Sequence, residues 1–177
     1  MAELQHAPDR LQAWVEAARG GDREAFGLLY EHMAPVVHGV LLSRVRAFDV
    51  SDLLQEVFAS ALQRLPMLED AAAFPGWLCS IARNAATDHL RRQAAAPTSN
   101  THTPYALASH VADARRVLEA IRTLPEAYRE PLVLRLVEGL TGREIADKTG
   151  LTPGSVRVNL SRGMKRLRET LGVTNDA

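Results

Sequence analysis

The basic side chains of residues 153–168 have the types and spacing to bind the phosphates of a nucleic acid. This segment contains no aspartate or glutamate and five cations, Arg157, Arg162, Lys165, Arg166 and Arg168. Such a one-sided excess of positive charge is typical of a surface that contacts phosphate. Apolar residues recur every three or four positions, at Val156, Leu160, Met164, Leu167 and Leu171. The spacing predicts a helix that packs on one side and presents cations on the other.

The residues before this helix predict a helix-turn-helix. Thr141 and Glu144 have the spacing of a capping box, and Gly150 suits the left-handed residue that ends a first helix. Thr152 and Pro153 suit the cap and first position of the second helix. Its first turns carry short or small residues, namely Gly154, Ser155, Val158 and Ser161. We favour a DNA-reading unit, and the alternative is an ordinary helical hairpin with a solvated basic face.

The elements that position these residues are expected to form two small all-α domains. Only 5% of residues are aromatic, and alanine, leucine and arginine are abundant, which favours helices. Helical apolar spacing begins after Asp22, resumes from about Ser51 to Leu65, and returns from Phe74 to Leu90. We expect an N-terminal extension (1–21), a first domain (22–93), a flexible linker (94–112), a second domain (113–172) and a tail (173–177). The second domain ends in the helix-turn-helix.

Charge is unevenly distributed along the chain. The 177 residues have a formal net charge of zero, yet residues 1–70 hold 11 acidic and 6 basic side chains, and the remainder holds 10 and 15. This asymmetry predicts a protein partner for the acidic part and DNA for the basic part. The single cysteine, Cys79, allows no internal disulfide. No apolar run approaches a membrane span and the first ten residues lack a signal-peptide core, so a cytoplasmic location is expected.

Catalytic and metal-binding motifs are absent from the sequence. It contains no glycine-rich phosphate loop, no HExxH, and no cysteine or histidine pair at metal-ligand spacing. Asp52 with Glu56, and His89 beside Asp88, are poor catalytic candidates. We therefore expect a protein that is not an enzyme and that uses neither a metal nor a cofactor.

Four stretches of the chain stand out, in order GDREAFGLLYEHM, DVSDLLQEVFASALQRL, FPGWLCSIARNAATDHLRR and LPEAYREPLVLRLVEGLTGREIADKTGLTPGSVRVNLSRGMKRLRE. Together they resemble the extracytoplasmic-function (ECF) group of sigma factors in the sigma-70 family. The resemblance covers nearly the whole chain. It implies a subunit that binds core RNA polymerase and directs promoter-specific transcription initiation. A stand-alone helix-turn-helix transcriptional regulator is the alternative, because the second domain alone does not separate the two.

The resemblance gives roles to polar residues of the first domain. Asp52, Gln55 and Glu56 share one helix face, which in the family docks on the clamp helices of the polymerase β′ subunit. Taken alone, an acidic face of this kind is usually solvated. Residues 66–75 and the following helix are implied to capture unstacked bases of the minus-ten promoter element. The residues concerned are Phe74, Arg83, Asn84, Asp88, Arg91 and Arg92. Trp77 lies on the apolar side and is expected in the core.

The second domain is implied to read the minus-thirty-five element and to hold the flap of the polymerase β subunit. The implied DNA-binding residues are Thr141, Arg143, Ser155, Arg157, Val158, Ser161, Arg162, Lys165 and Arg166. The sequence departs from the family pattern at Val158, Asn159 and Gly163, and a glycine inside a helix costs about 1 kcal/mol. An anti-sigma factor is a further partner implied by the resemblance.

Overall fold

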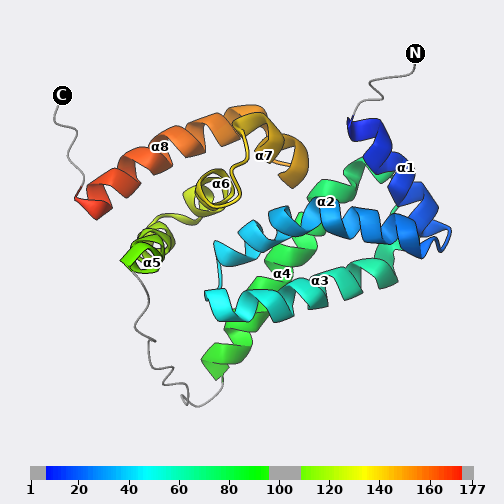
Figure 1. The fold of residues 1–177 in the computed structure, drawn as a ribbon, viewed down its shortest axis with the longest axis horizontal. Helices are drawn as coiled ribbons and strands as arrows, with labels where there is room; N and C mark the ends of the chain where they lie inside the picture. The colour runs from blue at the N-terminus through cyan, green and yellow to red at the C-terminus, as the bar shows by residue number, and fades with distance from the viewer. Residues whose placement is uncertain (1–6, 96–108, 173–177) are drawn as a thin grey trace.

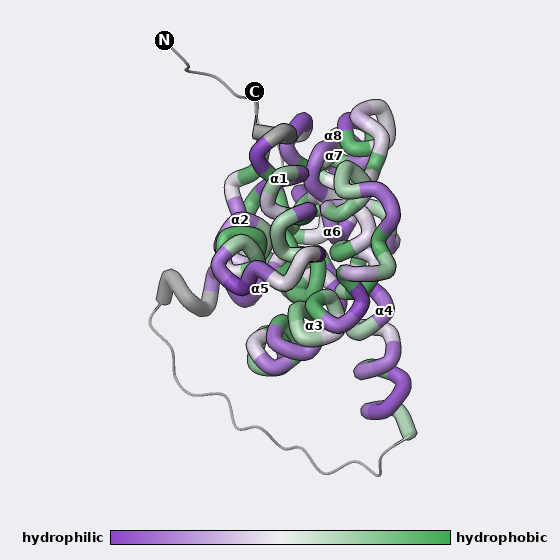
Figure 2. The backbone as a smooth tube through the Cα atoms, turned by 90° about the vertical axis from the view of Figure 1, so that its right-hand side faces the viewer, coloured by the Kyte–Doolittle hydropathy of each residue, from purple (hydrophilic) through white to green (hydrophobic). Residues whose placement is uncertain are grey.

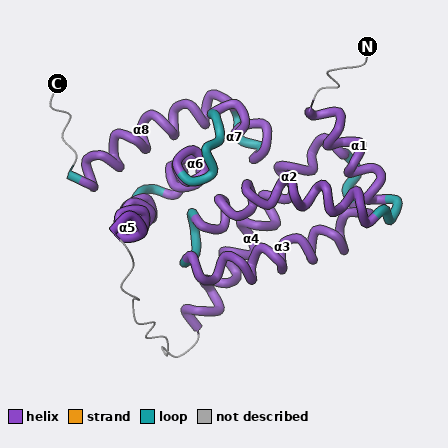
Figure 3. Tube along the Cα trace, in the orientation of Figure 1, coloured by secondary structure: helices purple, strands orange, loops and turns teal. Residues whose placement is uncertain are grey.

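The computed structural model describes residues 7–95 and 109–172, which form helices joined by short turns (Figure 1). The α-helices are α1 (Ala7–Arg19), α2 (Arg23–Leu42), α3 (Val50–Arg64), α4 (Phe74–Ala95), α5 (Ser109–Thr123), α6 (Glu126–Leu136), α7 (Gly142–Thr149) and α8 (Pro153–Leu171). Three short 3₁₀ turns adjoin α3 and α4, namely η1 (Ala47–Asp49), η2 (Leu65–Met67) and η3 (Ala71–Ala73). Within the described ranges there is no strand (Figure 3). The predicted all-α fold is therefore confirmed.

Helix α2 is the centre of the first domain and packs against α1, α3 and α4. It begins after Asp22, whose carboxylate accepts hydrogen bonds from the backbone N–H groups of Glu24 and Ala25 at 2.9 and 3.1 Å. By length and composition α2 is apolar enough to span a membrane, contrary to the sequence-based expectation. Its apolar side instead lies in the domain core, where Leu29 and Met33 are fully buried. Helix α2 is thus the core helix of this domain.

Residues 7–19, expected to lie in an extension, form helix α1 and pack against α2. The spacing of Leu11, Trp14, Val15 and Ala18 is helical, and Val15 is fully buried. The expected linker falls mainly on residues 96–108, which lie outside the described residues. Its margins differ from the prediction, because α4 continues to Ala95 and α5 begins at Ser109.

The second domain is built around α6, which contacts α5, α7 and α8. Gly163 allows α8 to cross α6 at a short distance. A Cβ atom at this position would lie 3.0 Å from Cδ1 of Leu132 and 3.1 Å from Cβ of Tyr128. The departure from the family pattern at Gly163 therefore has a packing reason, since the two helices meet where the glycine leaves room.

The two domains pack against each other through α2 with α6 and through α4 with α7. Buried residues from both domains form one continuous core, which includes Val36 and Val37 of α2 and Leu132 and Leu134 of α6. Figure 2 shows the hydrophobic stretches of the tube gathered in the middle of the molecule, where helices of both domains meet.

Candidate nucleic-acid and polymerase interfaces

The local chemistry predicted for the helix-turn-helix is present. The hydroxyl of Thr141 accepts a hydrogen bond from the N–H of Glu144, and the Glu144 carboxylate accepts one from the N–H of Thr141 at 2.8 Å. Gly150 has a left-handed φ of 75° and ends α7. Thr152 accepts from the N–H of Ser155 and caps α8. These caps fix the angle at which α8 leaves the turn.

Helix α8 presents one exposed basic and polar face. Val156, Gly163 and Leu167 are buried on its inner side. The predicted DNA-binding residues of α8 are all exposed, namely Ser155, Arg157, Val158, Ser161, Arg162, Lys165 and Arg166. Because the first turn of α8 has no acidic residue, its N-terminus remains suited to approach phosphate or base edges.

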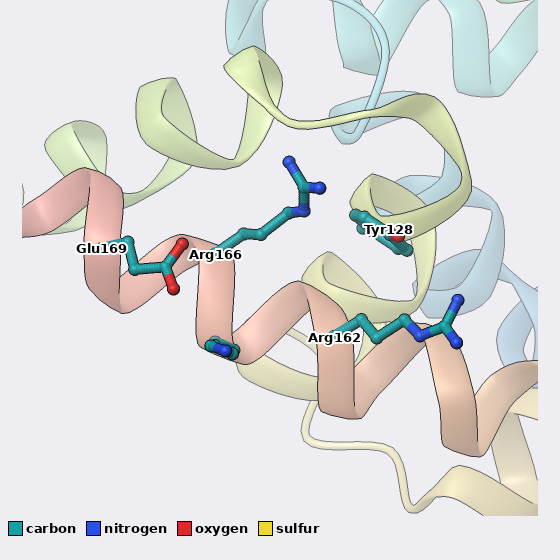
Figure 4. A pocket seen from close by; sticks show the side chains of 5 residues that line it. Tyr128, Arg162, Arg166 and Glu169 are labelled. Carbon is teal, nitrogen blue, oxygen red and sulfur yellow. The ribbon is translucent and has the colours of Figure 1, made fainter.

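Arg166 lies on the flank of this face beside α6. Its guanidinium carbon is 5.9 Å from the ring centroid of Tyr128, a cation–π distance. Figure 4 shows Arg162 and Arg166 extending toward the side of α8 where Tyr128 lies. These three residues line a shallow pocket with Lys165 and Glu169. Arg166 is therefore held toward α6, whereas Arg157 and Ser161 lie on the open face.

The hydroxyl of Thr141, which the sequence analysis assigns to DNA, takes part in the capping box. Besides accepting from Glu144, it donates to Oε2 of Glu144 at 2.7 Å. These hydrogen bonds lower the pKa of the Glu144 carboxyl. A phosphate contact through this hydroxyl would break the cap. The side chain of Arg143 is available to contact phosphate, because it is 91% exposed. Its Nε atom lies 3.8 Å from a carboxylate oxygen of Asp147.

The predicted minus-ten residues of α4 divide into a row of exposed side chains and Arg83, which is partly buried. Asn84, Asp88, Arg91 and Arg92 are exposed. Three of these residues, Asn84, Asp88 and Arg92, line a groove with Glu56 and Arg64 of α3. Arg83 is turned toward the second domain, where it donates hydrogen bonds to Glu130 at 2.7 and 3.0 Å. This hydrogen bonding raises the pKa of the Arg83 guanidinium.

Phe74, which the sequence analysis assigns to base contact, lies in the core of this structure. Its ring is fully buried and lies 5.9 Å from the Trp77 ring between centroids. Trp77 packs against the core, as predicted. Met67, which the sequence analysis included only within the stretch 66–75, follows Pro66 in η2 and is 80% exposed. An apolar residue directly after a helix-ending proline is the signal that singles it out within that stretch.

The acidic face predicted to bind polymerase lies beside the minus-ten row. Asp52, Gln55 and Glu56 are exposed on α3. Glu56 reaches Arg92 of α4 at 3.8 Å, so residues assigned to two different partners contact each other. No group of three histidine, cysteine, aspartate or glutamate side chains in the described part of the chain is placed to hold a metal ion.

The fold and these surfaces define a two-domain helix-turn-helix DNA-binding protein. Residues 29–96 match the family model of sigma-70 region 2, and residues 114–167 match that of sigma-70 region 4. The chain is 38% identical over 166 residues to the RNA polymerase sigma factor CarQ of Myxococcus xanthus, covering 89% of this chain and 95% of that protein. It is 32% identical over 184 residues to the ECF RNA polymerase sigma factor SigD of Mycobacterium tuberculosis, covering 95% and 87%. The chain therefore belongs to the ECF group of the sigma-70 family.

Solved structures share the fold. The structure of CnrH in complex with the cytosolic domain of CnrY superposes with a TM-score of 0.68 at 22% identity, covering 96% of this chain and all of that one. The sigma factor RpoE of Bartonella quintana, solved with the anti-sigma factor NepR, gives 0.58 at 21% identity over 85% of this chain and 98% of that one. Sigma factors bind core RNA polymerase and promoter DNA and are not enzymes. As a member of this family, the chain directs promoter-specific transcription initiation.

Proposed function

We propose a division of labour among the exposed residues in promoter recognition. The exposed basic face of α8 carries the proposal for the minus-thirty-five element. Arg157, Val158, Ser161 and Arg162 contact base edges in the major groove, since they lie in the first half of the helix. Ser155 lies at the start of the same helix. Arg143, Lys165 and Arg166 contact phosphate, and these contacts fix the position of the protein on the duplex without distinguishing bases.

The groove between α3 and α4 captures the opened minus-ten strand. Asn84 offers both a donor and an acceptor to a base edge, and Arg91 and Arg92 pair with phosphate. Asp88 accepts hydrogen bonds from exocyclic amino groups. Met67, which is 80% exposed in η2 before α4, supplies an apolar side chain that stacks against an unpaired base in place of the buried Phe74. Arg83 joins these residues once it is released from Glu130.

The acidic face of Asp52, Gln55 and Glu56 docks on the clamp helices of the polymerase β′ subunit, and the second domain holds the β flap. The exposure of all three side chains supports this assignment. The chain acts in the cytoplasm, where polymerase and promoter DNA meet. CnrH was solved with the cytosolic domain of CnrY, and the sigma factor RpoE was solved with the anti-sigma factor NepR. An anti-sigma factor is accordingly the proposed regulatory partner.

Run-off transcription with core polymerase and a library of randomised promoters tests this function. The expected result is that transcripts form only when chain and core are both present, from templates that share two sequence elements. A stand-alone regulator would instead bind one duplex sequence by itself, often as a symmetric dimer. Selective duplex binding without polymerase, together with no transcript in its presence, would contradict the proposal.

A further inference from the structure

The last turns of α4, residues 87–95, contain no buried side chain. The buried residues of this helix end at Ala86. Figure 2 shows the end of α4 as mostly hydrophilic and extending beyond the packed helices. This segment nevertheless includes three of the residues proposed to contact the minus-ten strand. Because a helix end without apolar packing opens readily, its position depends on the polar contacts that it makes.

Three polar residues connect this end of α4 to the start of α3, and we call Asp49, His89 and Gln93 the interhelix cluster. Nε2 of Gln93 lies 3.3 Å from Oδ2 of Asp49 and 2.8 Å from Nε2 of His89. The same Asp49 oxygen lies 3.3 Å from Nε2 of His89, and these two side chains are 12% and 19% exposed. An amide group has two hydrogens to donate. Gln93 can therefore bridge the carboxylate and the imidazole.

Asp49 stands where an aspartate usually caps its own helix. It directly precedes α3, but its backbone is helical, with φ −83° and ψ −16°, and its side chain makes no capping hydrogen bond. A capping aspartate has an extended backbone and accepts a hydrogen bond from an N–H group of the first turn. The carboxylate of Asp49 is directed to α4 instead. Its contact with Gln93 thus takes the place of a contact that would stabilise α3 alone.

The interhelix cluster lies between residues assigned to two different partners. Asp52 and Glu56 of the proposed polymerase face, and Arg92 of the proposed DNA-binding row, line the same shallow hollow as the cluster. Arg92 also directly precedes Gln93 in the chain. A hydrogen bond requires donor and acceptor to lie about 3 Å apart, so a displaced helix end would carry Arg92 out of reach of a strand held beside α3.

We propose that the interhelix cluster positions the end of α4 against α3, so that Arg91 and Arg92 meet the opened promoter strand while α3 is docked on polymerase. Asp49 and His89 are largely buried, so they act through the two arginines rather than by contacting DNA themselves. The tie between the helices rests only on contacts within the first domain. Its use at the promoter rests on the proposed function.

Hydrogen exchange in the free chain tests the tie without polymerase or DNA. Asp49→Ala removes the acceptor, and Gln93→Glu sets one carboxylate against another. We expect the backbone amides of residues 87–95 to exchange about tenfold faster in each variant, because a hydrogen bond to a charged group is lost. The matched control is Gln63→Glu, which adds the same charge at an exposed glutamine of α3. Exchange equal to wild type in both variants would overturn the proposal.

A double variant separates the specific contact from a general effect of charge. Asp49→Asn combined with Gln93→Glu exchanges donor and acceptor, because the new amide can donate to the new carboxylate. The two substitutions together leave the net charge of the chain unchanged. We expect hydrogen exchange of residues 87–95 to return to within about twofold of the wild-type rate. A double variant that exchanges as fast as Gln93→Glu alone would overturn the contact between these two residues.

Permanganate reactivity of the promoter, with core polymerase bound to the full chain, tests the positioning role. We expect Asp49→Ala and Gln93→Glu to reduce promoter opening about tenfold, the factor that one such hydrogen bond supplies. The double variant should restore opening, and all three variants should bind core polymerase as wild type does. Faster hydrogen exchange with normal promoter opening would overturn the positioning role. A wild-type chain that opens no promoter would contradict the proposed function instead, whatever the exchange rates show.

Discussion

At the scale of single residues, the position of a cation along α8 is expected to decide whether it contacts bases or phosphates of the promoter. Arg157 and Arg162 lie nearer the N-terminus of the helix than Lys165, and all three are exposed. We predict that Arg157→Ala and Arg162→Ala each cost roughly 1 to 3 kcal/mol at promoters with the preferred upstream element. Lys165→Ala should weaken transcription from all promoters alike. Transcription from promoters mutated at each upstream base measures the difference. If both arginine variants keep the wild-type base preference, these two arginines do not read the upstream element.

Phe74 and Met67 both lie in the stretch 66–75 assigned to base capture, but only one of the two side chains is exposed. Phe74 is fully buried, and Met67 is 80% exposed. We predict that Phe74→Ala lowers the free energy of unfolding by roughly 3 to 5 kcal/mol. Met67→Ala should change it by less than about 0.5 kcal/mol and should impair promoter opening. Urea unfolding and permanganate reactivity of the opened strand provide the two measurements. A stable Phe74→Ala protein would contradict the burial of this ring.

At the scale of elements, Gly163 sets the spacing of α6 and α8. We predict that Gly163→Leu destabilises the protein by roughly 1 to 3 kcal/mol, because the side chain overpacks against Leu132 and Tyr128. Gly154→Leu is the matched control, since a Cβ atom there meets nothing within 4 Å. Thermal unfolding of the two variants decides the matter. Equal effects of the two substitutions would show that helix propensity, rather than the close crossing, determines the cost.

His38 of α2 contributes a pH-dependent contact with the second domain. Its ring nitrogen lies 2.7 Å from a Glu138 oxygen, and this hydrogen bond raises the pKa of His38 above 6.5 against the opposing effect of burial. A raised folded-state pKa stabilises the protein fully below the unfolded value and loses that effect as pH rises through the folded value. Because His38 is partly exposed, solvent screening limits the contribution to roughly 0.2 to 1 kcal/mol.

The measurement is the difference in urea stability between wild type and His38→Gln. We predict that this difference is larger at about pH 6 than at about pH 8.5. His32, whose pKa is lowered mainly by burial and then by Lys148, acts in the opposite direction but is present in both proteins and cancels. A difference that does not change with pH would contradict the His38 contact.

Interactions between neighbours in sequence were predictable, whereas interactions across the domain boundary were not. The capping box joins Thr141 and Glu144, which are three positions apart, so residue types and spacing were sufficient to predict it. Arg83 and Glu130 are 47 positions apart, and no pattern in one sequence indicates that they meet. The burial of Phe74 likewise depends on tertiary packing rather than on its place at a helix start. The residues of α1 have the apolar spacing of a helix, but they precede the four stretches that carry the family resemblance and were therefore expected in an extension.

At the scale of the whole molecule, the acidic face of α3 adjoins the exposed α4 residues proposed to bind DNA. Glu56 lies 3.8 Å from Arg92, and both side chains are more than half exposed. An exposed ion pair of this kind contributes little to stability. Docking of polymerase on Glu56 would therefore leave Arg92 free for DNA at little energetic cost.

This arrangement predicts the outcome of removing both carboxylates of that face. Asp52→Ala with Glu56→Ala should weaken association with core polymerase about tenfold or more while changing the free energy of unfolding by less than about 1 kcal/mol, because both residues are exposed. Glu119→Ala is the control, since Glu119 is an exposed acidic residue on α5. Titration of labelled core polymerase gives the affinities. Unchanged affinity in the double variant, with normal circular dichroism, would show that this face of α3 does not bind polymerase. Polymerase docking would then have no effect on Arg92 through Glu56.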